Sequence, residues 1–116
     1  MNCTQKMKVI VIPKVYEYLE NLVVILYENE YFGHKDSARK YVDDLYYDIT
    51  TNLSILAKKR APKYFDKYGK GMYYVSYRKN KQTQWYVFFK MYQEKRGELI
   101  YQVRYIGNNH TVAQYL

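Results

Sequence analysis

The chain has 116 residues, and its 19 Lys and Arg residues against 11 Asp and Glu residues give a formal net charge of +8. This length predicts one domain spanning residues 1–116, and a hydrophobic share of 48% excludes a disordered chain. The longest apolar runs cover only a few residues, so we expect no membrane partner and a cytoplasmic location. Because Cys3 is the single cysteine, we expect neither a metal site nor another cofactor.

The chain begins with the pattern of a strand followed by a helix. Residues 7–12 are mostly apolar and β-branched and are closed by Pro13, as in an edge strand. Apolar residues then recur every three or four positions from Val15 to Leu26, which predicts an amphipathic helix. Gly33 is placed to end this helix in a left-handed cap.

A second apolar stripe predicts a second helix. It runs from Ala38 to Leu53, and Asp36 or Ser37 is expected to cap its first turn. The link between the two stripes is short, so we expect an antiparallel helical hairpin.

Beyond Leu56 the hydrophobic period changes from 3.6 to 2. Three strands are predicted, at residues 72–79, 84–94 and 99–106, and their connections have the length of hairpin turns. The three strands therefore form an antiparallel meander. The predicted fold class is α+β, in the order β-α-α-β-β-β, with an antiparallel sheet and the two-helix hairpin packed on one face.

Alternation in the middle strand assigns the two sides of this sheet. Trp85, Val87, Phe89 and Met91 are apolar, so the odd positions should face the helices and the even positions should face away. The side chains expected on this outer face are Tyr74, Ser76, Arg78, Tyr86, Phe88, Lys90, Tyr92, Gln102 and Arg104. Three cations among aromatic rings suit an anionic partner, whereas the alternative is an ordinary solvated face.

The charge of the chain is strongly asymmetric. Residues 1–56 carry 6 Lys or Arg and 8 Asp or Glu, whereas residues 57–116 carry 13 and 3, which are net charges of −2 and +10. The basic half also contains ten tyrosines and the only tryptophan. Such a surface attracts nucleic acid, anionic membranes or an acidic protein, and rings beside cations favour single-stranded nucleic acid. Within this half, the Lys-rich stretch 58–63 is expected to be a solvated loop.

Four segments resemble the RelE/ParE family of bacterial type II toxins. They are V-Y-E-Y-L-E-N-L-V-V-I-L-Y-E-N-E-Y-F-G, S-A-R-K-Y-V-D-D-L-Y-Y-D-I, W-Y-V-F-F-K-M-Y and I-Y-Q-V-R-Y-I-G. The resemblance covers residues 7–115. It implies the toxin of a toxin-antitoxin module of the plasmid stabilisation type, neutralised by a small antitoxin protein. The RelE-like branch is an mRNA interferase on the ribosome, and the ParE-like branch is a DNA gyrase inhibitor.

The resemblance also implies where RNA-cleaving residues would lie. Two family lysines fall on Tyr74 and Ser76, and two family arginines fall on Tyr86 and Asn109, so none of these positions carries a cation. The terminal family tyrosine matches Tyr115. Phosphate cleavage needs cations for the developing charge, so these replacements favour the gyrase-binding branch.

Two residues near the C-terminus are candidates for proton transfer. Tyr115 keeps the family residue type, and His110 is a candidate because an unperturbed histidine side chain can exchange a proton near neutral pH. The competing interpretation of His110 is a surface histidine in the tail. The sequence leaves open whether the chain is an enzyme, and the alternative function is a non-toxic cytosolic nucleic-acid-binding module of the same fold.

Overall fold

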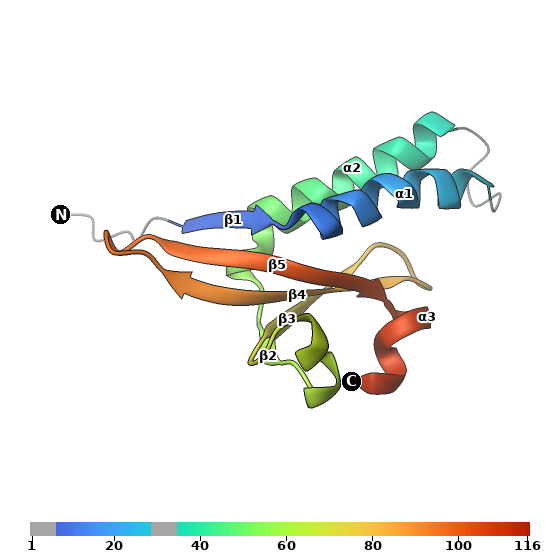
Figure 1. The fold of residues 1–116 in the computed structure, drawn as a ribbon. Helices are drawn as coiled ribbons and strands as arrows, with labels where there is room; N and C mark the ends of the chain where they lie inside the picture. Colours follow the sequence, from blue (N-terminus) through green and yellow to red (C-terminus); the bar gives the residue numbers. More distant parts are fainter. Residues whose placement is uncertain (1–6, 29–34) are drawn as a thin grey trace.

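The computed structural model describes residues 7–28 and 35–116, and it is an α+β fold (Figure 1). Its elements are β1 (Met7–Val11), α1 (Pro13–Glu28), α2 (Lys35–Asn52), β2 (Lys59–Arg60), β3 (Tyr73–Arg78), β4 (Gln84–Gln93), β5 (Leu99–Asn108) and α3 (Asn109–Val112), with 3-10 helices at Leu53–Ile55, Lys63–Tyr68 and Ala113–Tyr115. None of the helices within these ranges is long and apolar enough to cross a bilayer.

The two long helices follow from the apolar stripes. The predicted stripe of α1 supplies the buried residues Val15, Leu19, Leu22 and Val23. Helix α2 begins at Lys35, so the expectation that Asp36 or Ser37 precedes it as a cap is wrong. Both residues lie in the first turn, where the carboxylate of Asp36 still suits the positive end of the helix dipole. The predicted cap at Gly33 lies outside the described residues.

The sheet is mixed and has five strands in the order β1-β5-β4-β3-β2. Strand β1 pairs with β5 in parallel, with Val11 opposite Val103, so the prediction of an antiparallel sheet is wrong at this edge. Hydrophobic period locates a strand but carries no information on its direction. The stretch 58–63 is also more than a loop, because Lys59 and Arg60 pair with Tyr74 and Tyr73 as the short strand β2.

The first core lies between the helical hairpin and one face of the sheet. Trp85, Val87 and Phe89 are buried in it and Met91 packs against it, which confirms the predicted facing of β4. The indole Nε1 of Trp85 donates a hydrogen bond of 2.8 Å to the hydroxyl of Tyr41 on α2. This contact fixes the helical hairpin against the middle of the sheet.

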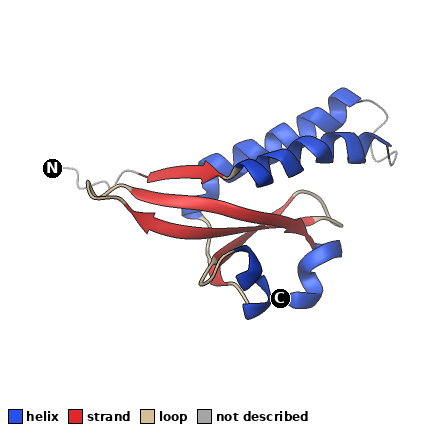
Figure 2. Ribbon diagram, in the orientation of Figure 1, coloured by secondary structure: helices blue, strands red, loops and turns tan. Residues whose placement is uncertain are grey.

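A second core lies on the opposite face of the sheet. It consists of Phe65, Met72, Phe88 and Val112, all buried. The 3-10 helix Lys63–Tyr68 and α3 pack over this face, on the side away from α1 and α2 (Figure 2). The expectation of an open outer face is therefore wrong around Phe88. The sequence did not indicate this cover, because each covering segment contributes one buried anchor and no periodic stripe.

A β-bulge interrupts the pairing of β4 with β5. Phe88 lies opposite Tyr105 and Phe89 lies opposite Val103, so Arg104 is an extra residue in β5. A bulge bends its strand and redirects the side chains on either side of it. Here it lets Arg104 and its neighbour Tyr105 both reach the segment that covers the second core.

Candidate functional site

Three of the predicted site residues, Tyr74, Ser76 and Tyr86, are neighbours on strands β3 and β4. Tyr74 and Tyr86 are half-buried beside the second core, with ring centroids 6.1 Å apart, and the Tyr74 ring is also 5.4 Å from that of Phe88. Ser76 is exposed next to them on β3. These two tyrosines are thus packing residues as well as members of the surface.

The predicted cations of this face do not form one cluster. Arg78 pairs with Gln84 at one end of β4, whereas Lys90 pairs with Gln102 six positions further along. At the rise of a strand this separation is about 20 Å. Arg78 donates to the backbone oxygens of Asn80 and Lys81 in its own hairpin, at 3.4 and 3.3 Å. The ammonium of Lys90 lies 5.8 Å from the ring centroid of Tyr92.

Arg104 is fixed between β5 and the segment that covers the second core. Its Nε donates to the backbone oxygen of Tyr68 at 2.6 Å, and its Nη1 donates to Oε1 of Gln102 at 2.8 Å. Gly69 permits this approach, because a Cβ at Gly69 would lie 2.8 Å from the Arg104 Nε. The φ of Gly69, 157°, also lies where other residues are strained. Arg104 is therefore positioned in advance of any ligand.

The C-terminal tail begins with residues that anchor it. The Asn109 side chain accepts a hydrogen bond from the backbone N–H of Gln84 at 3.0 Å and donates to the Gln82 oxygen at 3.1 Å. The backbone N–H of His110 donates to the side chain of Asn108, which caps α3. The His110 side chain is exposed at the rim of a cavity of about 390 Å³ beside Trp85.

Tyr115 belongs to an exposed group that the sequence analysis missed. Its ring stacks on that of Tyr64 at 3.7 Å with an interplanar angle of 3°, and the ammonium of Lys67 lies 4.1 Å from the Tyr64 centroid. Hydrogen bonds from Lys67 and from Tyr115 lower the pKa of Tyr64, and Tyr64 in turn raises the pKa of Lys67. His110 takes no part in these interactions, so the two proton-transfer candidates are not brought together. Folding brings Tyr64 and Tyr115 together, although they lie 51 positions apart in the sequence.

Replacing Lys67 with methionine should raise the pKa of Tyr64 toward its ordinary value. Lys67 is the largest cause of the lowered pKa, and an uncharged side chain no longer favours the phenolate. The measurement is an NMR titration of tyrosine Cζ resonances, with Tyr64→Phe identifying the signal. Lys70→Met is the matched control, since Lys70 is also exposed in this basic segment. An unchanged Tyr64 titration in the Lys67 variant would contradict this assignment.

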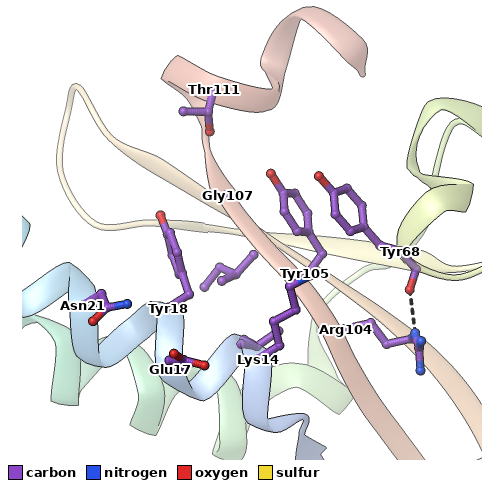
Figure 3. A pocket seen from close by; sticks show the side chains of 11 residues that line it. Lys14, Glu17, Tyr18, Asn21, Tyr68, Arg104, Tyr105, Gly107 and Thr111 are labelled. Atoms are coloured by element: carbon purple, nitrogen blue, oxygen red, sulfur yellow. Dashed lines mark hydrogen bonds between the residues drawn. The ribbon is translucent and has the colours of Figure 1, made fainter.

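A cavity of about 550 Å³ lies beside the bulge, between α1 and the far end of β5 (Figure 3). Strand β1 ends opposite Val103 while β5 continues to Asn108, so α1 borders the remaining length of β5 on this side. Tyr18 stands on one side of the cavity, and Tyr105 and Tyr68 stand on the other (Figure 3). Burial raises the pKa of Tyr18. The pKa of Tyr105 is raised mainly by burial and secondly by a hydrogen bond with the Tyr68 hydroxyl, so both phenol hydroxyls stay protonated at pH 7.

The described part of the chain contains no group of three or more His, Cys, Asp or Glu side chains that could hold a metal ion. Comparisons with protein-family models, with curated proteins and with solved structures find no match for this chain.

Proposed function

We propose that this chain is the toxin of a type II toxin-antitoxin module of the RelE/ParE type. The observation that supports the proposal is the arrangement of its elements. A strand and a helical hairpin precede a three-stranded meander, to which β2 adds a short edge strand. The hairpin packs on one sheet face, and a short tail carries Tyr115 back over the other face. The basic half of the chain contributes the meander and the segment that covers this second face.

The proposed toxin acts by binding its target rather than by cutting RNA, which makes DNA gyrase the favoured target over ribosome-bound mRNA. Cleavage would need cations near the scissile phosphate and a group that orients the 2′-hydroxyl. Tyr74 and Tyr86 instead pack beside the second core, and Asn109 bonds to the backbone of the β3–β4 hairpin. Arg104 is fixed by two hydrogen bonds and is the best-positioned cation of the predicted set.

The proposed partner in the module is a small antitoxin whose acidic groups complement this basic surface. A non-toxic nucleic-acid-binding module of the same fold is the second candidate. It is favoured by the exposed Tyr64 and Tyr115 rings beside Lys67, because rings and cations together bind the bases and phosphates of single strands.

Induced expression in a bacterial host should arrest growth, and co-expression of the proposed small antitoxin should relieve the arrest. Purified protein should inhibit gyrase in a supercoiling assay, and primer extension should reveal no ribosome-dependent cuts. Cuts in several transcripts would reverse the order of the two mechanisms. Normal growth at a high level of folded protein would contradict the toxin function and support the nucleic-acid-binding module.

A further inference from the structure

The cavity between α1 and β5 is not lined by the positions that the family resemblance assigns to RNA cleavage. Those positions are Tyr74, Ser76, Tyr86, Asn109 and Tyr115. Its volume of about 550 Å³ is in the range of pockets that hold small organic ligands, roughly 300–1,000 Å³. The cavity is therefore a separate candidate for a ligand site.

The walls of the cavity are aromatic on two sides. The Tyr18 ring stands on α1, and the Tyr105 ring opposite it is stacked on Tyr68 at a centroid distance of 3.9 Å and an angle of 10° (Figure 3). Two contacts hold the Tyr105 ring in place: it stacks on Tyr68, and it packs against the second core. Aromatic side chains on both sides of the cavity suit a flat aromatic ligand, because a base can contact a ring through its face or its edge.

The polar groups of the cavity are divided between its two ends. The hydroxyl ends of Tyr18, Tyr68 and Tyr105 point toward Thr111, whereas Lys14, Glu17 and Arg104 lie toward the opposite end (Figure 3). The guanidinium of Arg104 is already oriented by Tyr68 and Gln102. Two cations against one carboxylate leave this end with a net positive charge, which favours an anionic group there.

We propose that this cavity binds a single nucleotide, with its base between the Tyr18 and Tyr105 rings and its phosphate beside Lys14 and Arg104. The carboxylate of Glu17 suits the ribose hydroxyls, which donate hydrogen bonds to acidic side chains in other nucleotide sites. The amide of Asn21 and the hydroxyl of Thr111 offer donors and acceptors to the base edge. The nucleotide is either free in solution or one unit of a single-stranded nucleic acid.

Isothermal titration with AMP, CMP, GMP and UMP, and with a short single-stranded RNA, tests the proposal and separates the two sources. Binding of a mononucleotide supports a free ligand, and binding of the RNA alone supports a nucleotide within a strand. Lys14→Ala and Tyr18→Leu should each weaken that binding by about tenfold, the loss expected for one charged or stacked contact. In NMR spectra of the complex, the amide signals of Gly107 and Thr111 should shift.

The matched controls are Lys8→Ala and Tyr47→Leu, which remove an exposed lysine and an exposed tyrosine away from the cavity. Both should leave the affinity unchanged. Lys14 is exposed, so its variant tests the site even if the loss of Tyr18, which packs partly on the first core, disturbs folding. No binding of any mononucleotide or of the RNA, or binding that survives both cavity variants, would overturn the proposal. Growth arrest does not enter this measurement, so the site and the toxin function can fail independently.

Discussion

Replacing Phe65 with alanine should lower the free energy of unfolding by about 3–5 kcal/mol, the cost of removing a buried phenyl ring and leaving a cavity. Phe65 is fully buried, its ring centroid is 4.3 Å from that of Phe88, and it meets Tyr64 edge-on at 5.0 Å. It is the main apolar anchor of the 3-10 helix Lys63–Tyr68 on the sheet. Urea denaturation followed by fluorescence and circular dichroism measures the loss.

The same substitution should also release the segment that positions Arg104. Tyr68, whose backbone oxygen accepts from Arg104, lies in the helix that Phe65 anchors. Ile55→Ala is the control, because Ile55 is 74% exposed and its truncation should change stability by no more than about 0.5 kcal/mol. A Phe65 variant as stable as this control would show that the second core contributes little to folding.

The parts of the fold that were predicted correctly are those with long periodic patterns. Four apolar residues at alternate positions of β4 leave one way to face the core, since a shift by one residue would expose all of them. The stripes of α1 and α2 are similarly unambiguous over several turns. Patterns of this length determine both the element and the side that it buries.

The second core was not predictable in the same way. Its four buried members come from four separate segments, and no two of them share a helix or a strand. The parallel pairing of β1 was missed for a related reason, because pairing direction depends on how the helical hairpin returns the chain to the sheet. Contacts between distant single residues leave no local signature in a sequence.

The candidate site was likewise predictable from the sequence only in part. Alternation placed Tyr74, Tyr86 and Lys90 on the outer face, but it gave no sign that Tyr74 and Tyr86 would be half-buried there. The stacking of Tyr64 on Tyr115 and the cavity beside β5 both depend on where the covering segments fold. The hydrophobic period therefore predicted which side chains lie on the outer face, whereas the covering segments determine which of them are exposed.

Alternation also treats Arg78 and Arg104 as equivalent exposed cations, whereas their surroundings predict different effects of substitution. Arg104→Ala should lower the free energy of unfolding by about 1.5–3 kcal/mol, since it removes short, charge-assisted hydrogen bonds to Tyr68 and Gln102 and leaves the Tyr68 oxygen without its donor. Arg78→Ala should change stability by no more than about 0.5 kcal/mol, because Arg78 is exposed and its contacts are long and lie within one turn.

The two variants should differ in target binding as well. If the target is nucleic acid, each lost phosphate contact lowers the slope of log affinity against log salt by about 0.7–0.9. Gln84, the β4 partner of Arg78, lies about 20 Å from Lys90 along the strand. A ligand seated at Arg104 and Lys90 therefore need not reach Arg78. Arg104→Lys retains the charge, so we expect it to keep most of the salt dependence but to lose the hydrogen bonds that fix the side chain. Arg78→Ala should leave both the affinity and the slope nearly unchanged. Equal losses of affinity in the Arg78 and Arg104 variants would instead mean that the target spans the whole outer face, from the β3–β4 hairpin to the bulge.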